Sequence, residues 1–207
     1  IGEMVEGLLA DRVEGEPFDV IDGLAVPLPV RVIAELLGAD PGSAGQFREW
    51  ADIMTRTMSG SDRGGLGDEA GQAVLGLATY LAAEIEDRQR NERDDLLGVL
   101  VRAHGQEVLD HSEALGFAAL LLFAGSETTT NLIGNAVWAL LTHPAEQGRL
   151  ADEPHRLRAV LEETLRWESP VQYVFRRATA PFDRHGVRVP VDATVTLLLA
   201  AANRDPR

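Results

Sequence analysis

The stretch LLLFAGSETTTNLI, residues 120–133, lies at the centre of the longest helical pattern in this sequence. The pattern is free of proline from Ser112 to Thr142, and the dipeptide His143-Pro144 ends it, because proline cannot continue a helix. At about 1.5 Å per residue such a helix would be roughly 45 Å long, enough to cross a whole domain. The sequence therefore predicts one long central helix over about 112–142.

Polar residues interrupt the apolar run in the middle of this helix. Glu127, Asn131 and three threonines follow LLLFAG, and no basic flank orients the segment, so a membrane-spanning helix is disfavoured. Two interpretations stay open from these residues alone. Either the helix is buried and its hydroxyl groups bond back to preceding carbonyls, or Gly125 lets a flat ligand approach the backbone while Glu127 and Thr128 supply an acid and an alcohol for proton delivery.

The rest of the chain is mostly helical in pattern. Apolar residues at helical spacing predict further helices, among them a long amphipathic one over 68–92 and a shorter one over about 156–168. After Pro170 the pattern changes to alternating β-branched residues, which predicts strands within about 174–200. We expect one mainly α domain over 1–207 with a small β-sheet near the C-terminus. The glycine- and serine-rich segment Ser59–Gly67 is a candidate flexible lid.

Composition excludes several classes of protein. The chain has 207 residues, of which 45% are hydrophobic and 25% charged, which is typical of a globular domain and not of a disordered tail. The 33 acidic and 19 basic residues give a net charge of −14, and without a basic run we expect neither nucleic-acid nor membrane binding. Cysteine is absent, so these residues supply no disulfide and no thiolate ligand. The five histidines lack ligand spacing, so no metal site is predicted.

Glu163 and Arg166 lie one helical turn apart on the predicted helix 156–168. The spacing alone is a weak signal, because residues 146–149 and 153–156 also read Glu-x-x-Arg. The pair lies opposite the apolar face of its helix, so it is either solvated, as an ordinary ion pair one turn apart, or clamped by a later segment.

The surrounding segments decide how these signals are interpreted. They read AGSETT at 124–129, WESPV at 167–171, FRRAT at 175–179 and AANRDP at 201–206. Together with the Glu-x-x-Arg pair they resemble the cytochrome P450 family, in its soluble bacterial form of haem-thiolate monooxygenase, over essentially the whole chain. The resemblance implies the cytochrome P450 fold and a cytoplasmic enzyme that uses dioxygen and two electrons to hydroxylate or epoxidise a small hydrophobic substrate, with a ferredoxin-type electron donor.

The same resemblance implies roles for individual residues. Glu127 and Thr128 would be the catalytic acid and alcohol that organise protons and water. Glu163 and Arg166 would be a structural pair that locks the proximal side of the protein. Arg176 would bind a haem propionate, although a solvent-facing strand arginine is the ordinary alternative. The residues implied for haem contact are Leu121, Ala124, Gly125, Thr128, Val171 and Arg176.

The resemblance further implies that this chain is an internal part of such a protein. The family's upstream helix with histidine and arginine contacts has no counterpart, and the chain ends at Arg207, before the loop whose cysteine would ligate the iron. We therefore expect haem in the complete protein, no metal ligand within this chain, and no activity of the chain alone. The alternative is a catalytically silent, acidic helical protein that binds a ligand or serves as a scaffold; an all-α regulatory domain would not explain the segment around Arg176.

Overall fold

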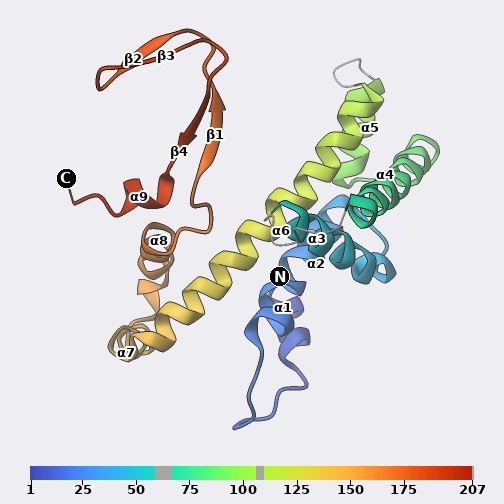
Figure 1. The fold of residues 1–207 in the computed structure, drawn as a ribbon. Helices are drawn as coiled ribbons and strands as arrows, with labels where there is room; N and C mark the ends of the chain where they lie inside the picture. The colour runs from blue at the N-terminus through green and yellow to red at the C-terminus, as the bar shows by residue number, and fades with distance from the viewer. Residues whose placement is uncertain (59–66, 106–109, 207) are drawn as a thin grey trace. The chain divides into compact units, whose positions relative to one another are not determined.

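The computed structural model describes residues 1–58, 67–105 and 110–206 (Figure 1). Contacts along the chain divide it into two compact units, Ile1–Thr130 and Asn131–Arg207. Helix α6 (His111–Thr142) passes through the boundary and contributes to both units. The candidate lid, except for Gly67, lies outside the described residues.

The regular elements in the described part of the first unit are all helices or helical turns. Its elements are α1 (Gly2–Leu9), the π-helix η1 (Ile21–Ala25), α2 (Pro27–Leu37), the 3-10 turn η2 (Pro41–Ser43), α3 (Ala44–Met58), α4 (Gly67–Arg90), α5 (Leu96–Gly105) and the beginning of α6. One apolar core connects α2, α3, α4, α5 and α6, built from Val30, Leu37, Phe47, Trp50, Ala73, Leu77, Leu81, Ile85, Leu97, Leu100, Ala114, Ala118 and Leu122. This core holds the first half of the long helix.

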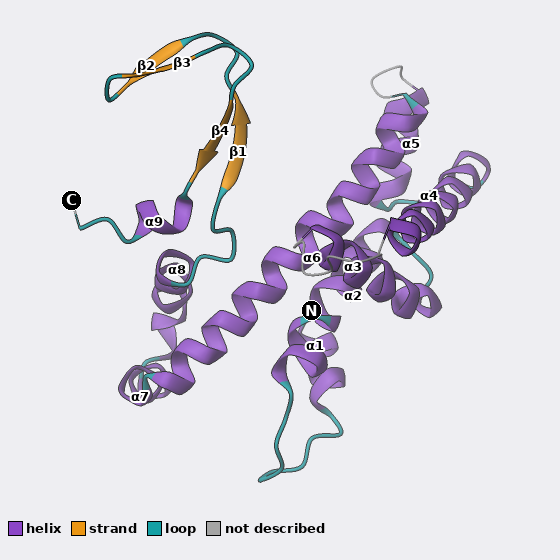
Figure 2. Cartoon of the chain, in the orientation of Figure 1, coloured by secondary structure: helices purple, strands orange, loops and turns teal. Residues whose placement is uncertain are grey.

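The second unit combines short helices with strands, which are orange in Figure 2. Its elements are the end of α6, α7 (Pro144–Asp152), the 3-10 turn η3 (Pro154–Arg156), α8 (Leu157–Trp167), β1 (Val174–Arg177), β2 (Phe182–Arg184), β3 (Val187–Val189), β4 (Thr194–Leu197) and α9 (Leu199–Asn203). The strands form two antiparallel pairs, β1 with β4 and β2 with β3. The mainly α fold with β structure near the C-terminus is thus confirmed, with two two-stranded sheets in place of one.

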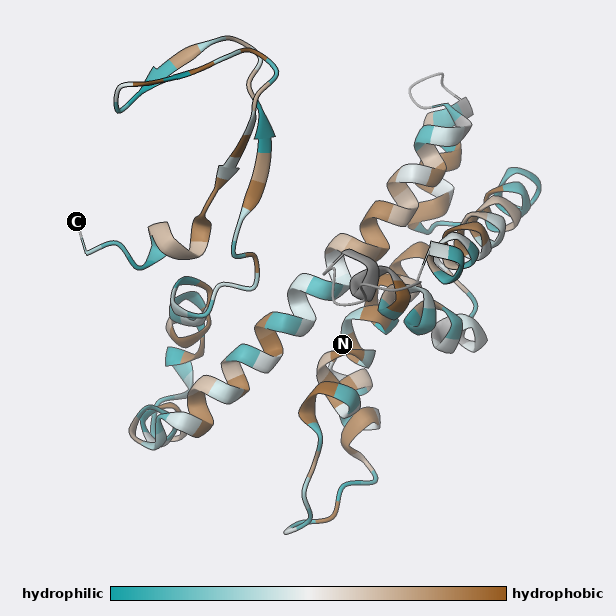
Figure 3. Cartoon of the chain, in the orientation of Figure 1, coloured by the Kyte–Doolittle hydropathy of each residue, from teal (hydrophilic) through white to brown (hydrophobic). Residues whose placement is uncertain are grey.

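Helix α6 begins slightly earlier than the sequence pattern indicates. The backbone N–H of Glu113 donates to the Asp110 carboxylate at 2.8 Å, and the Glu113 carboxylate accepts the Asp110 N–H at 2.8 Å. This reciprocal capping box satisfies two backbone donors that a helix start leaves without partners. Asp110 therefore caps the helix. Figure 3 shows hydrophobic and hydrophilic residues on this helix.

Candidate functional site

Two faces of α6 differ in burial around the AGSETT segment. Leu122 is fully buried and Ser126 is 4% exposed, so this face packs into the core of the first unit. The opposite face carries Leu121, Ala124 and Thr128 at spacings of three and four residues, and these are half-buried or exposed. Three of the residues predicted for haem contact therefore share the less buried side of the helix, although Leu121 also packs against the edge of the core.

Hydroxyl groups in this segment donate hydrogen bonds to preceding carbonyls of the helix, as the first of the two interpretations of the sequence predicts. The Thr128 Oγ1 donates to the Ala124 carbonyl at 2.8 Å, and the Ser126 Oγ donates to the Leu122 carbonyl at 2.6 Å. Such bonds satisfy the hydroxyl donor but leave the oxygen able to accept a hydrogen bond. The Glu127 side chain is half-buried, and within the described part of the chain nothing hydrogen-bonds to its carboxylate. An acid and an alcohol with spare acceptor capacity thus lie next to each other in the chain.

Gly125 allows α2 to approach α6. A Cβ atom added to Gly125 would lie 2.7 Å from Cδ1 of Ile33, which is shorter than the non-bonded contacts that Cβ atoms make in proteins. The Thr130 hydroxyl supports the same approach by donating to the Ala25 carbonyl at 2.8 Å. In this structure the missing side chain of Gly125 serves helix packing, and its contact with a flat ligand stays a prediction.

Of the three Glu-x-x-Arg spacings, the structure distinguishes one sharply. Arg166 donates to both carboxylate oxygens of Glu163, from Nε at 2.7 Å and from Nη2 at 2.6 Å, and its Nη1 donates to the Asn203 carbonyl at 2.7 Å. The pair at 146–149 has a single bond of 2.7 Å, and the pair at 153–156 is 3.6 Å apart. Glu163 and Arg166 are therefore both partly solvated and clamped to a later segment.

A second arginine, Arg204, joins the same two segments as Arg166, and the sequence pattern did not predict this contact. The Arg204 Nε donates to the Trp167 carbonyl at 2.8 Å, its Nη2 donates to the Glu168 carboxylate at 2.8 Å, and its guanidinium lies 4.5 Å from the centre of the Trp167 ring. Each of two neighbouring segments thus supplies an arginine to a backbone carbonyl of the other. The conspicuous AANRDP segment was the available signal, but its spacing of 37 residues from Trp167 gave no indication of the partner.

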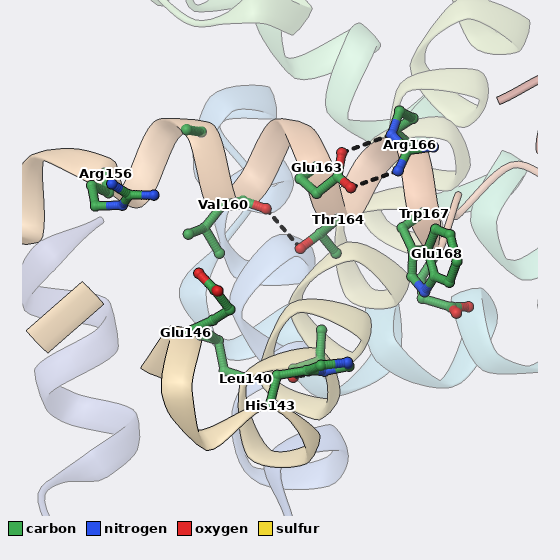
Figure 4. A pocket seen from close by; sticks show the side chains of 12 residues that line it. Leu140, His143, Glu146, Arg156, Val160, Glu163, Thr164, Arg166, Trp167 and Glu168 are labelled. Carbon is green, nitrogen blue, oxygen red and sulfur yellow. Dashed lines mark hydrogen bonds and ion pairs between the residues drawn. The ribbon is translucent and has the colours of Figure 1, made fainter. Parts of the chain in front are cut away.

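A cavity of about 480 Å³ lies beside this clamp (Figure 4). It is lined by residues from the end of α6, from α7 and η3, and from α8. Figure 4 shows the Glu163 carboxylate directed at Arg166 and the Thr164 hydroxyl directed at the Val160 carbonyl, a bond of 2.8 Å. None of its lining residues is one of those predicted for haem contact. The cavity is therefore separate from the predicted haem-contact residues.

Arg176 and Arg177 are adjacent on β1 but have different partners. Arg177 pairs with Asp192 at 2.9 Å. Arg176 donates only to the neighbouring Phe175 carbonyl, at 2.8 Å, and has no carboxylate partner among the described residues. Successive strand residues point to opposite faces, so the two guanidinium groups are separated. Val171, the other predicted contact in this unit, is half-buried in the turn before β1.

Neither a membrane span nor a metal cluster is found where the structure is described. No helix there is long and apolar enough to cross a bilayer. Groups of three or more potential metal ligands are likewise absent from the described ranges.

The Glu163–Arg166 contact changes the pKa of both groups. The hydrogen bonds from Arg166 hold the pKa of Glu163 below its ordinary value of 4.5, and the same bonds raise the pKa of Arg166. A carboxyl group with a lower pKa in the folded state stabilises the fold above its unfolded pKa and loses that effect as pH falls through the folded pKa. The contribution of the pair should therefore disappear in acid, below 4.5.

We predict that Glu163→Gln lowers the melting temperature of the full-length protein more than the same change at Glu146 or Glu153. Only Glu163 holds an arginine that also binds a carbonyl 37 residues away. Thermal unfolding followed by circular dichroism at about pH 7 and about pH 3.5 is the measurement, and the difference from wild type should shrink at the lower pH. Equal effects of all three substitutions at neutral pH would show that the pair is an ordinary surface contact.

Known proteins match this chain along nearly its full length. A family model described as Cytochrome P450 matches residues 65–207. Erythromycin C-12 hydroxylase of Saccharopolyspora erythraea is 38% identical over 207 residues, covering 99% of this chain and 52% of that protein. Vitamin D(3) 25-hydroxylase of Pseudonocardia autotrophica is 37% identical over 209 residues, covering 99% of this chain and 50% of that protein.

Solved structures agree with these sequence matches. The crystal structure of P450BioI in complex with an acyl carrier protein ligated to hexadec-9Z-enoic acid matches with a TM-score of 0.91 at 34% identity, over 99% of this chain and 53% of that one. The chain thus spans about half the length of the curated relatives it matches. On the family match and these relatives together, the chain belongs to the cytochrome P450 family.

Proposed function

We propose that this chain is part of a haem-thiolate monooxygenase that hydroxylates or epoxidises a small hydrophobic substrate, using dioxygen and two electrons from a ferredoxin-type donor. The observation that carries the proposal is the middle of α6, where Glu127 and Thr128 place an acid and an alcohol directly after the apolar stretch 120–125. Relatives named as hydroxylases support it.

The residues present fit part of a haem site. Leu121 and Ala124 offer an apolar surface beside the Thr128 hydroxyl. The Arg176 guanidinium, which lacks a carboxylate partner in the described chain, suits a propionate, because arginine binds carboxylates through parallel N–H donors. The thiolate that ligates iron is not among these 207 residues, which include no cysteine.

When bound, haem would supply the activation of dioxygen and the transfer of one oxygen atom to the substrate. This chain's own residues would control water and protons beside it. The Thr128 oxygen can accept a hydrogen bond from a water while its O–H group donates to the Ala124 carbonyl. Glu127, whose side chain is half-buried, would be the acid of the pair. The apolar residues one turn earlier would keep bulk water away.

The proposal is tested on the full-length protein by its absorption spectrum and its haem retention. We expect the reduced, carbon monoxide-treated protein to give the spectrum of thiolate-ligated haem, and Arg176→Ala to release haem about 10- to 100-fold faster, because a hydrogen bond to a charged group is lost. Arg177→Ala is the matched control, since it removes only an exposed pair with Asp192. A full-length protein that folds but takes up no haem would favour the silent scaffold.

A further inference from the structure

Asn135 forms a hydrogen bond that neither the motifs nor the proposed chemistry explains. Its side chain is half-buried on α6, seven residues beyond Thr128. The Nδ2 atom donates to the backbone carbonyl of Glu168 at 2.7 Å, across 33 residues of sequence. Glu168 is the residue that caps the C-terminus of α8, so the bond joins the long helix to the point where the chain leaves α8.

The carbonyls at a helix C-terminus lack partners within the helix and need donors from elsewhere. At the end of α8 these donors come from two elements. Asn135 binds the Glu168 carbonyl, and Arg204 binds the Trp167 carbonyl and the Glu168 carboxylate. The direction in which the chain leaves α8 is therefore held by both, and Asn135 supplies a hydrogen bond from α6.

The segment that follows has little freedom. The Ser169 hydroxyl donates to the Val171 carbonyl at 2.9 Å, and Pro170 between them has a fixed φ. The Gln172 carbonyl accepts the Ala200 N–H at 3.0 Å, and β1 begins two residues later. A constraint applied at Glu168 is thus transmitted along a short, stiff stretch.

We propose that Asn135 is a positioning residue, which fixes the turn after α8 and thereby places Val171 and Arg176. The contact of these two residues with haem rests on the proposed function, whereas the effect of Asn135 on the turn does not. Asparagine suits the task because its carboxamide donates to a carbonyl without adding charge. Aspartate at this position would place a second acceptor against the carbonyl oxygen.

The test compares Asn135→Leu with Asn131→Leu in the haem-loaded, full-length protein. Both asparagines are on α6, but Asn131 is exposed and forms no hydrogen bond in the described chain. Hydrogen–deuterium exchange should be about 10-fold faster at the amides of residues 171–176 in Asn135→Leu, the factor expected for one lost hydrogen bond. Asn131→Leu should leave those amides unchanged, and Asn135→Gln, which keeps an amide donor, should restore most of the protection.

Haem release separates positioning from a general loss of stability. If Asn135 acts through Arg176, Asn135→Leu should speed haem release in the wild-type background and add little in an Arg176→Ala background. If the two substitutions had fully additive effects on the rate of haem release, the inference would be overturned. Unchanged hydrogen–deuterium exchange at residues 171–176 in Asn135→Leu would overturn it as well. If Arg176→Ala itself leaves haem release unchanged, the propionate assignment is wrong, and the exchange data alone decide the role of Asn135.

Discussion

Arg88→Met is expected to lower the free energy of unfolding by about 3–5 kcal/mol, the cost of removing one partner from a buried ion pair. The Arg88 side chain is 0% exposed, and its Asp95 partner is 12% exposed. Arg88 donates to the Asp95 carboxylate at 2.9 Å from Nη2, to the Gly38 carbonyl at 2.5 Å, and also to the Glu84 carboxylate. Methionine would fill the space and leave two acids without their cation.

The position of Arg88 explains why the effect should extend through the first unit. Gly38 ends α2 in the left-handed conformation, with φ of 73°, and Asp95 accepts the Gly98 N–H at 2.7 Å, where α5 begins. Arg88 therefore joins the end of α2, the end of α4 and the start of α5. Burial by itself would lower its pKa, but the hydrogen bonds that it donates to Asp95 and Glu84 raise the pKa overall, so the arginine stays charged.

The matched control is Arg90→Met, two residues further along α4. Arg90 pairs with Glu86, and both side chains are about two-thirds exposed, at 66% and 64%, so its loss should cost between about 0 and 1 kcal/mol. Urea unfolding of the full-length protein, followed by circular dichroism, measures both. Equal denaturation midpoints for the two variants would contradict the role given to Arg88.

The sequence predicted the helices better than the contacts between them. The apolar stripe of α4 was visible as Leu77, Leu81 and Ile85, and Arg88 continues that stripe at the next turn. A charge on an apolar stripe was a readable signal of a buried pair, but its acceptor on Gly38 is 50 residues away. Periodicity reports which face of a helix is buried, and it carries no information about the partner.

The candidate site shows the same limit. The pattern around Glu163 left open whether its pair is solvated or clamped, because the Asn203 carbonyl that decides the matter comes from another segment. Asn135 carries no distinguishing signal in the sequence, since a polar residue on a half-exposed helix face is ordinary. The sequence pattern places the start of α6 at about Ser112, whereas the reciprocal bonds of Asp110 and Glu113 make Asp110 the cap.

Thr128→Ala is expected to reduce product formation in the full-length protein by about 10²-fold or more, within the range of 10²–10⁴ that a positioned proton-transfer group contributes. The hydroxyl is held by its bond to the Ala124 carbonyl, so its oxygen has a fixed position from which to hold a water. Without the hydroxyl, NAD(P)H should still be oxidised. Its electrons should then reduce dioxygen to hydrogen peroxide, which takes two electrons and two protons. Product, NAD(P)H consumption and peroxide are measured together with a ferredoxin-type donor.

Thr142→Ala is the matched control for this prediction, because Thr142 is on the same helix and also donates to the carbonyl four residues earlier, at 2.8 Å. Both substitutions remove a methyl-bearing hydroxyl that bonds back to α6, so an effect on helix stability alone would appear in both. Thr128→Ser keeps the hydroxyl and should retain most of the product. If Thr128→Ala lost haem, or if product per NAD(P)H matched that of Thr142→Ala, Thr128 would be a packing residue and the proton-delivery role would belong elsewhere on the helix.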